Sequence, residues 1–297
     1  MIRFAIALVA CFPLLAYSQP PIPDYPVDKI TEHTYVIHGP TDTPNVENQG
    51  FMNNPAFIVS DKGVIVVDPG SSEETGRMVM RQIKTITSKP ITHIFNTHVH
   101  GDHWFGNDAI RQVYPNVVVM ADPRMIKKAK AGEAQSFMDM LHRLTEGATK
   151  GTTIMYPTQE VKHAQELKIN GFTFRMHVVG KAHSDSDVMI EFVEDSLMFT
   201  GDNVSFERII RLDDGSFRDN IAACQHAIDL GLKHYVPGHG PTGDVNIVKE
   251  QKRYLDVLYS EAGKYYEEGL SDFEMKDQIV EQLTDFHGWN GFDEQVG

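Results

Sequence analysis

The sequence predicts an α+β protein with a four-layer αββα sandwich, in which two packed sheets carry helices on their outer faces. Two observations support this fold class. Each half of the chain contains a run of short apolar strands followed by segments with helical periodicity. The 297 residues also contain no repeat and no low-complexity linker between the halves. We therefore expect both halves to belong to one domain.

In the first half, apolar runs alternate with turn residues. Strands are expected at 34–38, 56–60, 64–68, 92–96 and 117–121. The turn Asp61-Lys62-Gly63 makes a hairpin of the second and third of these strands. Helices are expected at 73–87, where apolar residues recur on one side, and at 107–114.

The second half repeats this arrangement after a segment, 122–163, that has mostly helical and loop character with scattered Met and Lys. Strands are expected at 172–179, 188–192, 197–200 and 234–237. Helices are expected at 221–230, 245–266 and 271–283. The Met-rich part of the middle segment, 120–155, is expected to be core or cover, with a mobile flap as the alternative.

Residues 1–18 have the layout of a secretory signal peptide. Arg3 supplies a positive charge, an apolar run spans 4–15, and Ala16-Tyr17-Ser18 offers small residues for cleavage. The apolar run is too short to anchor the chain in a bilayer. An alternative is lipidation at Cys11, which ends a lipobox-like tetrapeptide. We expect cleavage after Ser18, a single domain over 19–297, no membrane span after cleavage, and a periplasmic or secreted protein.

Composition narrows the classes of partner. The chain is 41% hydrophobic and 23% charged, which is ordinary for a soluble globular protein. Its formal net charge of -14 disfavours nucleic acid and anionic membranes, since both are polyanions. We expect a small-molecule substrate, and the pattern leaves the oligomeric state open. Cleavage would leave Cys224 as the one cysteine, so no intramolecular disulfide is expected, and its apolar helical setting favours a buried packing role.

A dense run of metal-binding side chains follows the expected strand at 92–96. It reads His98-Val99-His100-Gly101-Asp102-His103. On an extended segment, His98 and His100 would point the same way and could grip one ion. Four ligands in six residues cannot all reach one ion without strain, but they could serve two neighbouring ions. Imidazole and carboxylate without thiolate favour an open, catalytic zinc site over calcium or magnesium.

This run looks like the HxHxDH signature of the metallo-beta-lactamase superfamily. Three later residues match the family's other ligand positions in order, namely His183, Asp202 and His239. Asp68, at the end of an apolar strand, resembles the family's strand-end aspartate outside the ligand set. The resemblance covers about residues 28–248. One departure is that Ser184 and Ser186 stand where the family often has Thr and Gly after the histidine.

The resemblance implies two zinc ions, with iron or manganese as alternatives. The first ion would be held by His98, His100 and His183, and the second by Asp102, His103 and His239. Asp202 would bridge the two ions. Because zinc lowers the pKa of bound water to about 7, a metal-bound hydroxide would serve as the nucleophile at neutral pH. Asp102 would also orient this nucleophile, which makes it the expected catalytic residue.

The resemblance further implies an exported dinuclear zinc hydrolase that acts on an ester, thioester or amide bond, lactams included. An Asp at 202 is similar to the glyoxalase-type branch rather than to dedicated lactamases of the third subclass. Asn54-Pro55-Ala56-Phe57 resembles exported relatives associated with quinoproteins and sulfur oxidation. Three alternatives remain open: a beta-lactamase proper, an iron-dependent oxidoreductase similar to persulfide dioxygenases, and a non-catalytic metal-binding protein.

Several other residues allow two interpretations. Arg208, Arg211 and Arg218 could meet an anionic substrate or could be solvated surface charges. Trp104 could line a substrate pocket or pack in the core. The histidines outside the motifs are expected to be ordinary core or surface residues. They are His38, His93, His142, His163, His177, His226 and His234.

Overall fold

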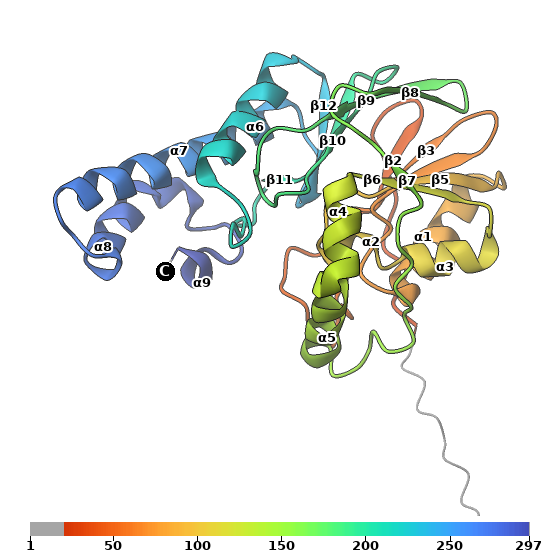
Figure 1. Cartoon of the computed structure of the whole chain (residues 1–297), viewed down its shortest axis with the longest axis horizontal. Coiled ribbons are helices and arrows are strands. Elements are labelled where there is room, and N and C mark those ends of the chain that lie inside the picture. Colours follow the sequence, from red (N-terminus) through yellow and green to blue (C-terminus); the bar gives the residue numbers. More distant parts are fainter. Residues whose placement is uncertain (1–20, 297) are drawn as a thin grey trace, which may run out of the picture.

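Two sheets face each other and carry helices on their outer sides in the computed structural model, which describes residues 21–296. Helices α1 and α3 lie on the side of the first sheet, and α6 and α7 lie on the side of the second (Figure 1). The predicted αββα fold class is therefore confirmed. The expected signal peptide, with Cys11, lies outside the described residues.

The first sheet has the order β1-β2-β3-β4-β5-β6-β7, so neighbours in sequence are neighbours in space. Its strands are β1 (Asp28–Lys29), β2 (Thr34–Val36), β3 (Ala56–Val59), β4 (Val64–Val67), β5 (Ile91–Phe95), β6 (Val118–Ala121) and β7 (Gln159–Glu160). Pairing is antiparallel up to β4 and parallel from β4 onward. Parallel pairs need crossover connections. The connection from β4 to β5 contains α1 (Glu73–Ile86), that from β5 to β6 contains α2 (Gly101–Trp104) and α3 (Asn107–Val113), and that from β6 to β7 contains the helical segment 123–144.

The second sheet has the order β12-β11-β10-β9-β8. Its strands are β8 (Glu166–Ile169), β9 (Phe172–His177), β10 (Met189–Phe192), β11 (Leu197–Ser205) and β12 (His234–His239). The parallel pair β11 and β12 is connected through α6 (Phe217–Asp229). The chain then continues through α7 (Val245–Glu267), α8 (Asp272–Gln282), η2 (Thr284–Phe286) and α9 (Phe292–Gln295).

Strand β4 explains why the sheets stack as they do. All four of its residues are buried, and successive side chains of a strand point to opposite faces. Ile65 and Val67 pack between the two sheets with residues such as Phe174, whereas Val64 and Val66 pack under the helices of the first sheet. A continuous apolar run therefore marks a strand that is covered on both sides.

The structure extends two strands beyond their expected ends. β11 runs to Ser205 rather than Thr200, and β12 runs to His239 rather than Pro237. Their apolar patterns stop early, but pairing between Ser205 and His239 continues the ladder. Both extensions contain expected metal ligands. The short strands β1, β7 and β8 were not expected from the sequence, because they lack apolar runs.

Helices α4 (Pro123–Lys128) and α5 (Ala134–Leu144), joined by the π-helical turn η1 (Ala129–Glu133), form a column beside the two sheets (Figure 1). Met125 and Met138 are buried in this column against Trp104 and Phe105. Trp104 is fully buried and donates its indole N–H to the Val99 carbonyl over 2.9 Å. Trp104 is therefore a packing residue. Within the Met-rich segment, Met120 packs in the core between the sheets, whereas Met125 and Met138 pack in the covering column.

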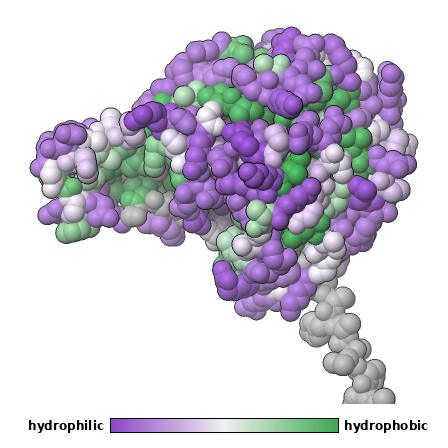
Figure 2. Space-filling model, in the orientation of Figure 1, coloured by the Kyte–Doolittle hydropathy of each residue, from purple (hydrophilic) through white to green (hydrophobic). Residues whose placement is uncertain are grey.

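The C-terminal helices α7 and α8 project from the sandwich as an arm (Figure 1). Hydrophobic residues lie on the surface of this arm in Figure 2, and Tyr266 and Phe273 are 73% and 76% exposed. Cys224 of α6 is fully buried, and burial raises the pKa of its thiol to about 12, as expected for a packing cysteine. Among the described residues, none of the helices has the length and apolar character to cross a bilayer.

Candidate metal centre

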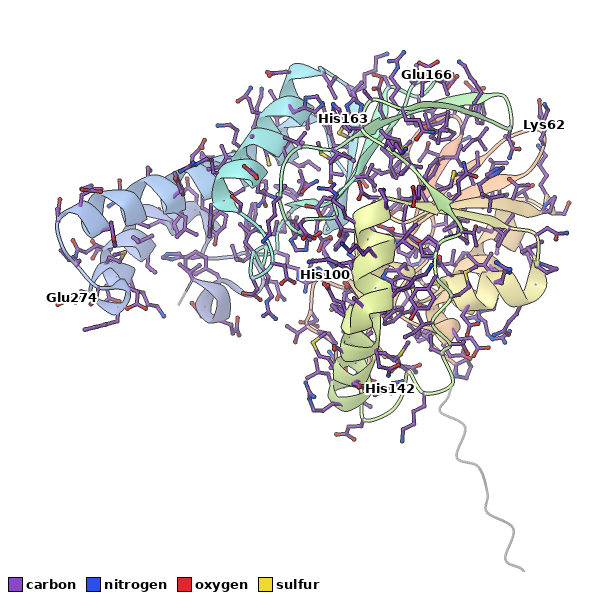
Figure 3. All side chains as sticks on the ribbon, viewed as in Figure 1. Lys62, His100, His142, His163, Glu166 and Glu274 are labelled. Atoms are coloured by element: carbon purple, nitrogen blue, oxygen red, sulfur yellow. The ribbon has the colours of Figure 1, made fainter. Side chains whose placement is uncertain are left out.

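The seven expected ligands converge from the ends of strands in both sheets. His98 and His100 follow β5, Asp102 and His103 lie in α2, and His183 lies in the loop between β9 and β10. Asp202 belongs to β11, and His239 is the last residue of β12. Figure 3 shows His100 beside the column of α4 and α5.

The first group of donor atoms comes from His98, His100, His183 and Asp202, and all four atoms lie within 4.8 Å of one another. His183 Nε2 is 2.9 Å from His100 Nδ1 and 3.5 Å from Asp202 Oδ2. His98 Nε2 lies 3.9 Å from the same carboxylate oxygen and has no hydrogen-bond partner among the described residues. A buried ring nitrogen in this position fits a metal ligand.

The second group comes from Asp102, His103 and His239. His103 Nε2 and His239 Nε2 are 3.4 Å apart, and each lies 3.5 Å from Asp102 Oδ2. Asp202 reaches this group too, with Oδ1 3.0 Å from His103 Nε2 and Oδ2 3.2 Å from His239 Nε2. The Asp202 carboxylate therefore lies between the two groups, where a bridging ligand has to lie.

Protonation of the cluster suits metal binding. Burial lowers the pKa of His183 to about 3 and that of His98 well below its usual value, and neighbouring histidines lower it further. Both rings are therefore neutral near pH 7, and a neutral imidazole offers a lone pair to a metal. Burial alone would also lower the pKa of His103, but the Asp202 and Asp102 carboxylates outweigh burial and raise it well above its usual value. A bound dication would replace this proton.

Asp68 orients the first part of the cluster from the end of β4. Its carboxylate accepts from the Thr97 N–H over 2.9 Å and the Thr97 hydroxyl over 2.6 Å, and it lies 2.9 Å from His103 Nδ1. A carboxylate on the second nitrogen of a ligating histidine fixes the ring and its tautomer. Asp68 has a left-handed backbone with φ 50, which Asp tolerates better than most residues. The expected role of Asp68 outside the ligand set agrees with these contacts.

His239 is held by residues that precede β3. Asn54 donates its side-chain amide to the Pro237 carbonyl over 2.9 Å and the Gly240 carbonyl over 2.7 Å. Its backbone N–H also donates to the Gly238 carbonyl over 2.9 Å. His239 Nδ1 lies 3.0 Å from the Met52 carbonyl oxygen. This clamp fixes the direction in which His239 Nε2 points.

The segment after His183, where Ser184 and Ser186 differ from the usual family residues, forms a compact turn. Ser184 donates its backbone N–H and its hydroxyl to the Asp187 carboxylate over 2.8 and 2.6 Å, and its oxygen accepts from the Ser186 N–H over 3.1 Å. Burial raises the pKa of Asp187 to about 7 despite these bonds. The two serines thus build the turn themselves, and His183 remains in the cluster.

Sequence reasoning missed the partners of His100. Its Nε2 lies 3.2 Å from Asp214 Oδ2, and this hydrogen bond lowers the pKa of Asp214 to about 2. Phe137 of α5 stacks on the His100 ring, with ring centroids 5.6 Å apart. No local pattern marks Asp214 or Phe137. The strand before the cluster was expected to end at Asn96, and β5 ends at Phe95, with a bend at His98 and Val99 rather than a fully extended segment. Both rings nevertheless belong to the first donor group.

Comparisons with known proteins agree with this site. A sequence profile of the metallo-beta-lactamase superfamily matches residues 49–239. A probable metallo-hydrolase of Streptococcus pyogenes is 31% identical over 194 residues, which cover 64% of this chain and 79% of that protein. An atrochrysone carboxyl ACP thioesterase of Claviceps purpurea is 24% identical over 229 residues, which cover 75% of this chain and 60% of the thioesterase.

Two solved structures share the fold. A metallo-beta-lactamase from Pontibacter korlensis matches with a TM-score of 0.62 and 19% identity, over 78% of this chain and 98% of its own. A stereoselective inverting sec-alkylsulfatase from Pseudomonas sp. matches with a TM-score of 0.68 and 16% identity, over 84% of this chain and 44% of its own. At these identities, the likeness concerns the fold alone.

Proposed function

This chain belongs to the metallo-beta-lactamase superfamily, and we propose that it is an exported zinc hydrolase that cleaves a thioester, ester or amide bond, lactams included. The observation that carries the proposal is the Asp202 carboxylate, which lies within 3.9 Å of ring nitrogens from both donor groups. A bridging carboxylate between two sets of three ligands is the arrangement of a two-ion hydrolytic site.

Two zinc ions in these groups would supply an activated water and stabilise negative charge on the carbonyl oxygen of the substrate. We assign Asp102 as the residue that accepts a hydrogen bond from this water and so orients it. Its Oδ2 lies 3.5 Å from the Nε2 atoms of His103 and His239. Asp102 is 4% exposed, so bulk water does not compete for its carboxylate. Asp68 and the Asn54 clamp keep the imidazoles in position.

Two observations narrow the substrate within this class. First, relatives of the chain include thioesterases and a hydroxyacylglutathione hydrolase, which favours a thioester. Second, Arg208 Nη1 lies 2.6 Å from His239 Nδ1, and Arg208 forms an ion pair with no carboxylate among residues 21–296. In contrast, Arg211 pairs with Asp213, and Arg218 bonds the Tyr259 hydroxyl at the surface. Arg208 therefore favours a substrate that carries an anionic group.

The test begins with elemental analysis of the purified mature protein, which should start at Gln19 and contain about two zinc ions per chain. The same sample is then offered thioesters, esters and lactams, each in an anionic and a neutral form. We expect hydrolysis to be fastest with an anionic thioester and to be lost in Asp102→Asn. Full zinc occupancy with no hydrolysis of any compound would refute the proposal. Bound iron with oxygen uptake on a persulfide would instead support an oxidoreductase.

Arg208 and Arg211 form a matched pair for the substrate charge. Arg208→Met should raise KM for the anionic thioester about tenfold or more and leave KM for its neutral analogue unchanged, because a charged hydrogen bond contributes roughly 1.5–3 kcal/mol. Arg211→Met should change neither value, since its side chain is 62% exposed and already paired with Asp213. Equal effects of Arg208→Met on both substrates would show that Arg208 only supports His239.

A further inference from the structure

A second pair of imidazoles lies outside the candidate metal centre. His177 is the last residue of β9, and His226 lies in α6. His177 Nδ1 and His226 Nε2 face each other at 2.9 Å, with ring centroids 5.0 Å apart. The candidate ligand pairs His100–His183 and His103–His239 have nitrogens 2.9 and 3.4 Å apart. The outer pair thus has the spacing of the main centre.

A buried carboxylate orients the outer pair. His177 Nε2 lies 3.0 Å from Glu191 Oε2, and the other oxygen of Glu191 accepts from Arg175 over 3.1 Å. The Glu191 side chain is 7% exposed, so this contact is protected from solvent. An Nε2–H that donates to Glu191 leaves the lone pair of His177 on Nδ1, toward His226. This is the arrangement in which a carboxylate supports a metal-ligating histidine.

The surroundings keep the lone pair available. Burial lowers the pKa of His177, and the charges of His226 and His163 lower it further, although Glu191 opposes this shift. His163 itself accepts the Val178 N–H through Nδ1 over 3.1 Å, so it is not a third ligand in this arrangement. His226 is half-buried, which leaves room for water on the open side of the pair.

The spacing also indicates the class of ion. Two nitrogens 2.9 Å apart, each about 2.05 Å from an ion, subtend an angle of about 90° at that ion. Adjacent ligands of a tetragonal copper(II) or nickel(II) ion make this angle. Copper(II) also binds nitrogen ligands most tightly among the divalent first-row ions.

We propose that His177 and His226 form a peripheral site for a divalent transition ion of the copper class, with water completing its coordination. The ion would tie α6 to the end of β9. The other end of α6 holds the loop of His183, since Asp219 accepts from the Lys181 N–H over 2.8 Å and the Ser216 N–H donates to the Ala182 carbonyl over 2.9 Å. Occupancy would therefore steady the helix that anchors one side of the main centre.

The test uses the mature protein with its main centre loaded with zinc and excess metal removed. Copper(II) is added in stoichiometric amounts, and bound copper and released zinc are counted after equilibrium dialysis. We expect one copper per chain with no loss of zinc, and an electron paramagnetic resonance spectrum that shows two imidazole nitrogens. A higher Tm with copper than without should accompany binding, because an ion that binds only the folded state stabilises it.

Variants separate this site from adventitious copper. His226→Gln should lose the copper and keep all zinc, and His177→Gln should do the same. Glu191→Gln should keep the stoichiometry but weaken copper affinity roughly 10–100-fold. The matched control is His142→Gln in α5, where the ring contacts the Thr149 carbonyl at 3.3 Å, and it should behave as the unaltered protein. Copper that enters only as zinc leaves, or equal copper binding by His226→Gln, would overturn the proposal.

Discussion

The two halves of the candidate metal centre are built in different ways. The N-terminal half places its four donors within one short segment, His98 to His103, that follows β5 and enters α2. The C-terminal half takes His183, Asp202 and His239 from a loop and two strands of the second sheet. One half therefore depends on local backbone geometry, whereas the other exists only when distant segments pack correctly.

The residues that hold the ligands in place also differ between the two halves, because one set is local and the other is distant in sequence. In the N-terminal half, the Asp68 carboxylate accepts hydrogen bonds from the Thr97 N–H and the Thr97 hydroxyl, and it contacts His103 Nδ1. In the C-terminal half, Asn54 ties the segment before β3 to the His239 loop, 183 residues away in the chain at Pro237. Damage to the first support should thus affect metal binding, and damage to the second should also affect folding.

The largest effect is expected from Asp202→Asn, because Asp202 is the one residue of the C-terminal half that reaches both donor groups. Removal of its charge should lower the affinity for both ions by more than the roughly 10–100-fold typical of a residue outside the ligand set. Hydrolysis should fall with occupancy. Elemental analysis after dialysis against a competing chelator measures the effect.

The matched control for Asp202→Asn is Asp185→Asn. Asp185 pairs with Lys128 over 2.9 Å, and its side chain is 36% exposed, so its loss should leave metal content unchanged. Two zinc ions bound to Asp202→Asn with undiminished affinity would contradict the bridging role and leave two independent sites.

Asp68→Asn should have the next largest effect. Asn keeps the size of the side chain and also tolerates the left-handed backbone of Asp68, so the fold should survive. The amide cannot stabilise the His103 ring as a carboxylate does, and affinity for the ion beside Asp102, His103 and His239 should fall roughly 10–100-fold. Binding measured by chelator competition should become biphasic, with one ion retained. Equal loss of both ions would show that Asp68 supports the whole centre.

The difference between the halves also explains what the sequence could predict. The spacing of His98, His100, Asp102 and His103 indicated metal binding by itself, because the ligands lie close together before any folding is considered. The C-terminal ligands could be assigned only through the resemblance to a known family. Asp214 escaped notice, because its contact with His100 joins residues that are far apart in sequence. Zinc, export and the substrate remain predictions.

In the fold too, some elements could be predicted from local sequence and others could not. Buried strands such as β4 were expected almost to the residue, since four consecutive apolar residues leave little choice of register. The ends of β11 and β12 were not, because Asp202 and His239 continue the strands with polar side chains. Pairing between strands extends both elements there, and such pairing is a tertiary effect that local pattern does not contain.

The smallest effect, and the sharpest comparison, comes from two neighbouring asparagines. Asn53 donates its amide to the Asp68 carbonyl over 2.8 Å and so serves the N-terminal half, whereas Asn54 serves the His239 loop. Asn54→Ala removes two side-chain hydrogen bonds and leaves two carbonyls without these donors. It should cost about 2–3 kcal/mol and lower the Tm of the metal-free protein by several degrees.

Asn53→Ala removes one such bond and should cost about 1 kcal/mol, so its metal-free Tm should fall less than that of Asn54→Ala. In both variants, metal should recover part of the lost stability, because ions that bind only the folded protein favour it. If Asn53→Ala lowers the metal-free Tm as much as Asn54→Ala does, the N-terminal half also depends on distant packing. The contrast between a local and an assembled half of the centre would then be wrong.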